Sequence, residues 1–402
     1  MKMRFLAISS LLRSGSGFMG SSLRGAWCSK QSAASMTKLR HFSADSSGME
    51  DEYGVMDASG NIAVLPDFQL ECGKTLKSPQ VCYKTWGTLN EQKDNAMVVC
   101  HALTGNADLE SWWGGLLGPG KPFDTDKYFV VCANVVSSCY GSTNHASADP
   151  ATGKPYGRYF GPVTVRDSVG MHLATVRGLG VRGVQAVIGG SLGGMQALEW
   201  LLLGGPLVKA GVVIGCGATH TSWQIAVSEA QRQAIYADPR WAGGHYPPEH
   251  PPLKGLSVAR QIAMVTYRSS EGYHRKFGRE VQPHPEAHEG EAFSVRSYLE
   301  YQGEKFLSRF DPLSYVQMTE LMDSHDVGRG RGGVDQALAS VQQPTLVIGI
   351  DSDILYPLWM QEELAEKIPG ADLKIVRSID GHDAFLLEQE QISGFINDFL
   401  QK

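Results

Sequence analysis

Six short, almost continuous apolar runs recur along the chain, and helical patterns separate most of them. In chain order the runs are AMVVCHAL (96–103), YFVVCANVV (128–136), VQAVIGG (184–190), AGVVIGCG (210–217), TLVIGI (345–350) and LKIVRSI (373–379). Strands of this kind are buried on both faces, and helices between them connect parallel neighbours. The pattern predicts an α/β fold with a mostly parallel central sheet flanked by helices.

The gap between the fourth and fifth runs is too long for a single crossover helix. It holds the helical patterns SWQIAVSEAQRQAIYA, SVARQIAMVTYR and SVRSYLEYQGEKFLSRF, together with a loop rich in Pro, Gly and His, GGHYPPEHPP. We interpret residues 218–342 as a helical lid inserted into a sheet domain that residues 45–217 and 343–402 form together.

The first 44 residues differ in composition from the rest of the chain. Residues 1–44 contain seven Lys or Arg, ten Ser and no acidic residue. That composition is typical of an organellar transit peptide, and we expect the segment to be disordered. The stretch LRHFSADSS resembles a mitochondrial processing site. The expected location is the mitochondrial matrix, with a plastid or the cytoplasm as alternatives.

Composition and charge exclude several classes of function. With 42% hydrophobic and 19% charged residues, the chain can bury a sizeable core. A net charge of −6 argues against nucleic acid as a partner, because binding phosphates needs a basic face. No apolar run reaches the roughly 18–20 residues that span a bilayer, so no membrane partner is expected.

Cysteine and histidine spacings give little support for disulfides or a metal. The seven cysteines are scattered and contain no C-x-x-C, which favours small core residues in a reducing compartment. The spacing His284-x-x-x-His288 falls in the loop-like stretch PHPEAHEGE. We therefore expect no metal site.

One glycine-rich turn carries a candidate nucleophile. Ser191 lies between Gly189 and Gly193, and a chain with 46 glycines can contain G-x-S-x-G by chance. Here, however, the strand-like VQAVI precedes the turn and the helix former GMQALEWLLL follows it. In a strand–turn–helix elbow the serine hydroxyl points out at the carboxyl end of the strand, near the positive end of the helix dipole.

A serine nucleophile needs a general base and an acid that orients the base. Asp351 and Asp353 follow the run TLVIGI, and His382 follows LKIVRSI. Of the twelve histidines, only His382 has the required order and strand-end position. The sequence predicts a Ser-His-Asp triad and leaves the acid open between the two aspartates.

An oxyanion formed at this serine needs backbone donors. We expect the N–H of Leu192 and one N–H from the loop HALTGNA, with Leu103 as its candidate. His101 in that loop is interpreted as a structural turn residue rather than a second base.

Several segments together resemble a known family. They are HALTG (101–105), CYGSTN (139–144), DPATGKPYG (149–157), TVRD (164–167), GGSLGGM (189–195), EAQRQAI (229–235), DSDILYP (351–357) and GHDAFL (381–386). With these segments in this order, the chain resembles the homoserine O-acetyltransferase family of the α/β-hydrolase superfamily. That family includes the related serine O-acyltransferase branch.

The resemblance implies an α/β-hydrolase fold and a ping-pong reaction through a covalent acyl-enzyme. It implies Ser191 as nucleophile, His382 as base and Asp353 as the triad acid. It also implies that Arg232 holds the carboxylate of an amino-acid acceptor and that Asp383 holds its ammonium group. The donor is acetyl-CoA or succinyl-CoA, no cofactor is bound permanently, and a homodimer is expected.

Alternatives remain for the acceptor and for one arginine. L-homoserine is the expected acceptor, but GNADLESWWGGLLGPG (105–120) resembles the serine branch and keeps an L-serine O-acetyl- or O-succinyltransferase open. An esterase or thioesterase with the same triad and a non-catalytic binding protein are further alternatives. Arg166 is interpreted as a structural ion pair, with a contact to CoA as the alternative.

Overall fold

The computed structural model describes residues 60–287 and 290–402, so the transit peptide expected at 1–44 lies outside the described residues. Eight strands form one sheet in the order β1-β4-β6-β5-β7-β8-β11-β12. They are β1 (Asn61–Val64), β4 (Gln80–Trp86), β5 (Ala96–Cys100), β6 (Phe129–Ala133), β7 (Val184–Gly190), β8 (Gly211–Ile214), β11 (Thr345–Ile350) and β12 (Asp372–Val376).

The sheet is mostly parallel, which confirms the predicted fold class. All neighbours from β6 to β12 pair in parallel, whereas β1 and β4 pair antiparallel at one side. The apolar runs did not reveal β1 and β4, because QVCYKTW of β4 is only partly buried. A small separate hairpin joins β2 (Phe68–Gln69) to β3 (Thr75–Leu76).

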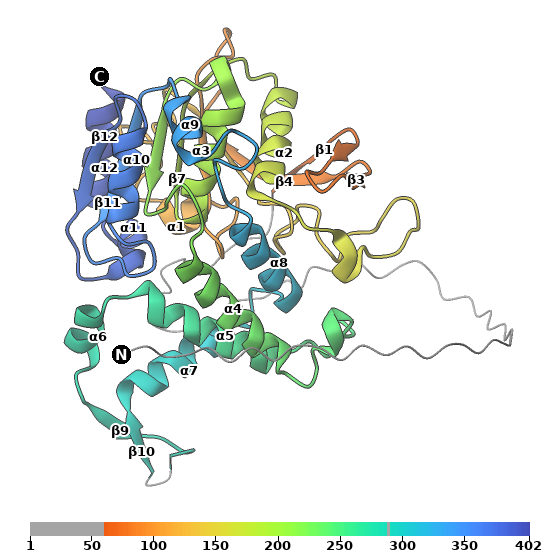
Figure 1. Cartoon of the computed structure of the whole chain (residues 1–402), viewed down its shortest axis with the longest axis vertical. Helices are drawn as coiled ribbons and strands as arrows, with labels where there is room; N and C mark the ends of the chain where they lie inside the picture. Colours follow the sequence, from red (N-terminus) through yellow and green to blue (C-terminus); the bar gives the residue numbers. More distant parts are fainter. Residues whose placement is uncertain (1–59, 288–289) are drawn as a thin grey trace, which may run out of the picture. The chain divides into compact units, whose positions relative to one another are not determined.

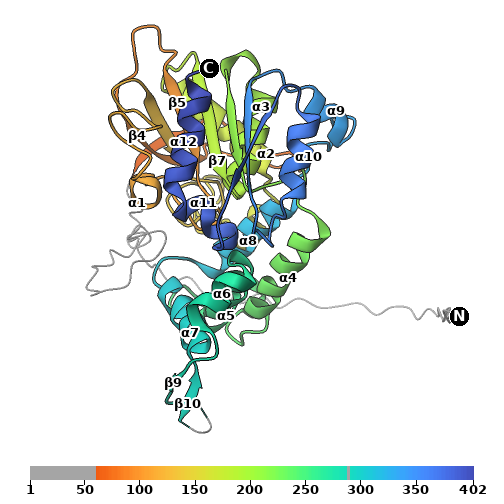
Figure 2. The same ribbon diagram turned by 90° about the vertical axis from the view of Figure 1, so that its left-hand side faces the viewer.

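Alternate residues of the parallel strands bury opposite faces of the sheet. In β5, Met97 and Val99 belong to one core cluster with Trp113, while Val98 and Cys100 belong to the other. Helices α2 and α3 cover one face, and α1 and α12 cover the other (Figures 1 and 2). Burial on both faces explains why these strands are continuous apolar runs.

The sheet domain contains the following helices. They are α1 (Glu110–Trp113), α2 (Val165–Gly178), α3 (Leu192–Gly204), α10 (Trp359–Lys367), α11 (Ala384–Leu387) and α12 (Gln389–Leu400).

A helical insertion follows β8 and returns to β11. Its helices are α4 (Ser222–Tyr236), α5 (Leu253–Tyr267), α6 (Ser270–Phe277), α7 (Ser294–Phe306), α8 (Pro312–Asp323) and α9 (Val334–Ala339). Helix α5 packs between α4 and α7, and these helices lie at the end of the sheet where β8 leads into α4 (Figure 2).

Two features of the insertion differ from the sequence interpretation. A short hairpin of β9 (Val281–Pro283) and β10 (Glu291–Phe293) precedes α7, and no strand was predicted there. Helix α9 packs on α10 of the sheet domain, and its Leu338 is buried. The last part of the 218–342 segment therefore lies with the sheet rather than with the other inserted helices.

No helix within the described residues is long and apolar enough to cross a membrane. The six cysteines in that part of the chain are free thiols, and four of them are buried: Cys82, Cys100, Cys132 and Cys216.

Candidate active site

Ser191 occupies the sharp turn between β7 and α3. Its φ and ψ are 58° and −123°, in a region that residues with a side chain rarely adopt. The turn is possible because its neighbours lack side chains. A Cβ on Gly189 would lie 2.2 Å from the carbonyl oxygen of Gly193, and one on Gly193 would lie 2.1 Å from that of Cys100. The fold thus requires glycine on both sides of a strained, buried serine.

The structure brings Ser191, His382 and Asp353 into one hydrogen-bonded chain. His382 Nε2 lies 2.8 Å from Ser191 Oγ, and His382 Nδ1 lies 2.6 Å from Asp353 Oδ2. The other oxygen of Asp353 accepts hydrogen bonds from the backbone N–H groups of Leu355 and Tyr356, both at 2.8 Å. The three residues follow β7, β12 and β11, whose carboxyl ends meet at one edge of the sheet. This arrangement can activate a serine hydroxyl.

The geometry separates the two candidate acids. Asp351 Oδ2 lies 3.2 Å from the exposed side chain of Arg377, and Asp351 Oδ1 accepts from the backbone N–H of Ser378. Asp351 therefore belongs to a surface ion pair, and Asp353 is the aspartate that contacts the histidine.

The surroundings of His382 tune its basicity. Burial alone lowers the pKa of His382, but the negative charge of Asp353 and its hydrogen bond raise that pKa above its ordinary value. The rings of Tyr356 and Tyr267 lie 5.2 and 6.1 Å from the imidazole ring. The imidazole therefore lies between aromatic rings, and the carboxylate to which it is hydrogen-bonded is that of Asp353.

Backbone donors for an oxyanion are available at the start of α3. Leu192 is the first residue of this helix, where N–H groups have no acceptor within the helix. Gln196 Nε2 donates to the carbonyl oxygen of His101 at 3.0 Å, which fixes the loop that carries Leu103 beside α3. The two predicted donor segments are therefore neighbours.

His101 is held as a structural residue. Its Nε2 accepts from the backbone N–H of Val135 at 3.0 Å, so its Nδ1 carries the proton and donates to the carbonyl oxygen of Ala102 at 2.8 Å. Burial lowers the pKa of His101 to about 4. Both ring nitrogens are occupied by backbone partners, which fits the predicted turn role.

Arg232 of α4 is buried, and two of its three guanidinium nitrogens have carboxylate partners. Its Nη2 lies 2.7 Å from Asp323 Oδ2, and its Nε donates to Glu229 at 2.9 Å. Its Nη1 is buried, and it has no hydrogen-bond partner among the described residues. Arg232 is thus fixed in place with one donor atom available to a ligand.

A polar chain links Arg232 to the triad. Asp323 Oδ1 lies 3.6 Å from His220, and His220 Nδ1 lies 3.1 Å from the hydroxyl of Tyr356, whose backbone N–H binds Asp353. Burial, with smaller effects of the nearby His325 and Arg232, lowers the pKa of His220 to about 3, so this histidine is neutral. Tyr356 lies in the segment DSDILYP, but no sequence motif pointed to His220 or Asp323.

Asp383 follows the triad histidine directly and is fully buried. Its Oδ2 lies 3.1 Å from Arg268 Nε, and Arg268 Nη1 also lies 2.8 Å from Asp380. Burial raises the pKa of Asp383, while the positive charges of Arg268 and Arg260 oppose that rise. An ammonium group at Asp383 would therefore share the carboxylate with Arg268, a partner that sequence reasoning missed.

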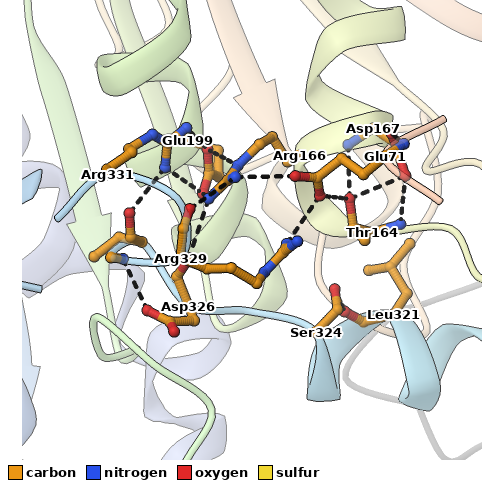
Figure 3. Close-up of polar contacts among 12 residues, drawn as sticks. Glu71, Thr164, Arg166, Asp167, Glu199, Leu321, Ser324, Asp326, Arg329 and Arg331 are labelled. Atoms are coloured by element: carbon orange, nitrogen blue, oxygen red, sulfur yellow. Dashed lines mark hydrogen bonds and ion pairs between the residues drawn. The ribbon is translucent and has the colours of Figure 1, made fainter. Parts of the chain in front are cut away.

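Figure 3 shows that Arg166 belongs to a network of ion pairs. Its guanidinium lies 2.9 Å from Glu71 and 3.3 Å from Glu199. Arg331 binds the same Glu199 through two nitrogens, and Arg329 lies 2.8 Å from Glu71. The network joins α2, α3 and the segment after α8, which accounts for Arg166 as a structural ion pair.

His284 of the His284-x-x-x-His288 spacing has a carboxylate partner. His284 Nε2 lies 2.6 Å from Glu300, and His288 lies outside the described residues. Within residues 60–287 and 290–402, no group of three His, Cys, Asp or Glu side chains could hold a metal ion.

A serine on a strand–turn–helix elbow, with a histidine and an aspartate after later strands of a parallel sheet, defines an α/β hydrolase with a Ser-His-Asp triad. Consistently, residues 95–389 match the family described as alpha/beta hydrolase fold. An esterase, E22, shares this fold with a TM-score of 0.78 at 24% identity, over 85% of this chain and 99% of that one. The fold alone therefore does not separate an esterase from an acyltransferase.

The nearer relatives define the family. The chain is 48% identical over 335 residues to a homoserine O-acetyltransferase of Chlorobium chlorochromatii (strain CaD3), covering 83% of this chain and 93% of the relative. The crystal structure of a homoserine O-acetyltransferase from Bacillus anthracis matches with a TM-score of 0.79 at 25% identity, over 85% and 97% of the two chains. The chain belongs to the homoserine O-acetyltransferase family of O-acyltransferases, which confirms the resemblance seen in the sequence.

Proposed function

We propose that the protein transfers the acetyl group of acetyl-CoA to the side-chain hydroxyl of L-homoserine. The observation that carries this proposal is the 48% identity, over most of both chains, to a homoserine O-acetyltransferase. The hydrogen-bonded chain of Ser191, His382 and Asp353 supplies the chemistry that such a transfer needs. L-serine and the succinyl donor are the alternatives that the experiment below separates.

Acylation of the enzyme is the first half of the reaction. His382 Nε2 takes the proton of Ser191 Oγ as that oxygen attacks the thioester carbonyl. The backbone N–H groups of Leu192 and Leu103 donate to the resulting oxyanion. The C–S bond then breaks, His382 returns its proton to the departing sulfur, and free CoA leaves an acetyl ester on Ser191.

The acceptor hydroxyl completes the transfer. His382 takes the proton of this hydroxyl as its oxygen attacks the acetyl ester on Ser191. A second oxyanion forms between the same donors. When it collapses, the bond to Ser191 Oγ breaks and His382 returns the proton to that oxygen. The O-acetylated amino acid leaves and the free serine is restored.

Two charged residues orient the acceptor in this proposal. Arg232 Nη1 donates to the α-carboxylate, and this atom is a buried donor with no other partner in the described part of the chain. Asp383 accepts from the α-ammonium group, beside Arg268. An acceptor held at both ends presents its side-chain hydroxyl at high effective concentration.

Transfer rather than hydrolysis requires that water reaches the acyl-enzyme slowly. Tyr267 of lid helix α5 packs against the imidazole ring of His382, and Ser191 and His382 are buried. The inserted helices thus cover the reacting atoms, and a bound acceptor replaces water there.

A single assay tests the proposed function. Free thiol release is followed with acetyl-CoA or succinyl-CoA, each in the presence of L-homoserine, L-serine or no acceptor. The proposal requires release from acetyl-CoA that depends on homoserine and yields O-acetylhomoserine. Release independent of any acceptor identifies a thioesterase, and dependence on serine identifies the serine branch.

We also propose that residues 1–44 direct the chain to the mitochondrial matrix. The proposal rests on the acid-free, Ser- and Arg-rich composition of this segment. Import of the full-length chain into isolated mitochondria, with shortening near Ser43, is the expected result; a chain that stays outside and unprocessed contradicts it.

A further inference from the structure

A cavity of about 260 Å³ lies beside the catalytic loop, between lid helices α6 and α7. Residues Ile379 and Asp380, which immediately precede Gly381 and His382, form one of its walls. Helix α6 packs closely on this wall, because a Cβ on Gly272 would lie 2.7 Å from the carbonyl oxygen of Ile379. The cavity therefore borders the loop that positions the triad histidine.

Cationic groups converge on this cavity. Arg268, Arg275 and Lys276 line it, and Asp380 is the acidic residue in its lining. Arg268 is held by Asp380 and Asp383, at 2.8 and 3.1 Å.

The other two cations are available to a ligand. Among the residues that the structure describes, the carboxylate partner of Arg275 is Glu271, in a solvent-exposed pair of a kind that contributes little stability. Lys276 has no carboxylate within ion-pair distance among the described residues. Partial burial and the positive charge of Arg268 lower the pKa of Lys276, while the negative charge of Asp380 opposes that effect.

Three aromatic rings form the apolar part of the same cavity. Phe277 lies 4.9 Å from Tyr298 and 5.7 Å from Tyr273, measured between ring centroids. The ammonium group of Lys276 lies 4.5 Å from the centroid of Tyr298. Adjacent ring faces and cations are the combination that binds a nucleobase and its phosphates.

We infer that this cavity binds the 3′-phosphorylated adenosine diphosphate end of the acyl-CoA donor, with Lys276 and Arg275 on its phosphates and the Phe277–Tyr298 pair against the adenine. This inference rests on the proposed use of an acyl-CoA. The donor's thioester then extends along the catalytic loop toward Ser191. The nucleotide end is distant from the reacting bond, so we expect loss of these contacts to raise the KM for the donor, as loss of binding that is equal in the ground and transition states does.

Two donors that differ only in the nucleotide test this assignment. The KM for acetyl-CoA is measured beside kcat/KM for the acetyl thioester of N-acetylcysteamine, which lacks the nucleotide. Lys276→Met combined with Arg275→Gln raises the KM for acetyl-CoA by about 10-fold or more and leaves the truncated donor unaffected. The control Lys254→Met makes the same change at an exposed lid residue outside the cavity and alters neither value.

Direct binding keeps this test separate from the test of the proposed function. Adenosine 3′,5′-bisphosphate is titrated into the wild-type protein, the double variant and Phe277→Leu by calorimetry. Binding to wild type that both variants weaken supports the assignment whatever the acceptor is. Equal affinity in all three proteins, no binding to wild type, or equal losses with both thioester donors would overturn it. Absence of any transfer from acetyl-CoA by wild type would overturn the proposed function instead.

Discussion

The Nε2 atom of His382 lies 2.8 Å from the Oγ atom of Ser191, although the whole helical insertion separates the two residues in the chain. Parallel strands make this possible, because β7, β11 and β12 all end at the same edge of the sheet. The insertion leaves after β8 and covers that edge without displacing the strands. The triad residues thus meet at the end of the sheet, and Tyr267 of the inserted helix α5 lies beside His382.

The two neighbouring aspartates provide a matched pair for the triad acid. Asp353→Asn removes the charge that orients His382 and is expected to lower kcat by about 10⁴-fold, as loss of a triad acid does. Asp351→Asn changes only a surface pair with Arg377 and should leave kcat within about two-fold. Steady-state kinetics of both variants check this; equal losses at the two positions would refute the assignment.

The acidic side of the pH profile reports the state of His382. Only the neutral imidazole can take the proton of Ser191, and the charge of Asp353 raises the pKa of His382. The value of kcat/KM for acetyl-CoA should therefore fall as pH decreases through a midpoint above about 6.5, the ordinary value for histidine. In Asp353→Asn the midpoint should move to lower pH, because only the charge of Asp383 then opposes the effect of burial on the pKa of His382. A midpoint that stays in place in the variant contradicts this.

Gly193 should tolerate no side chain. A Cβ there would lie 2.1 Å from the carbonyl oxygen of Cys100, so Gly193→Ala must push α3 and β5 apart. We expect a loss of about 1–3 kcal/mol in the free energy of unfolding and a large loss of activity. The control is Gly394→Ala at an exposed position of helix α12, where a Cβ meets nothing within 4 Å. That change should stabilise the protein by about 0.5–1 kcal/mol. Denaturant unfolding of both variants measures the difference.

Arg232→Lys tests the proposed carboxylate contact. Lysine keeps the positive charge but has a single nitrogen. It cannot bind Asp323 and Glu229 and also offer a further donor, as the three guanidinium nitrogens of Arg232 can. We expect the KM for homoserine to rise by about 10-fold or more, with the KM for acetyl-CoA unchanged. Arg296→Lys, at an exposed ion pair on α7, serves as control. An unchanged KM for homoserine would remove the assigned role of Arg232.

The sheet and the triad residues could be predicted because local patterns encode them. Strands buried on both faces are apolar throughout, and the elbow around Ser191 needs glycine at fixed positions. Strands β1 and β4, at one side of the sheet, were not predicted because half-exposed strands mix polar and apolar residues. The hairpin of β9 and β10 has exposed or half-exposed residues throughout and carries no such pattern.

Partners that are distant in sequence could not be predicted from local patterns. Asp383 and Arg268 meet only because α6 follows α5 onto the catalytic loop. His220 and Asp323, which lie between Arg232 and the triad, belong to no motif, and only the structure shows them as a chain of polar contacts. The choice of Asp353 over Asp351 likewise depends on side-chain direction, which spacing alone leaves open.

The central claim is that Ser191 carries the acyl group between donor and acceptor. Intact-protein mass spectrometry after mixing with acetyl-CoA, without acceptor, measures this most directly. Wild type should gain the mass of one acetyl group at Ser191 and lose it when homoserine is added, while Ser191→Ala gains none. Acetylation that persists in Ser191→Ala, or an adduct that homoserine does not discharge, would contradict the claim.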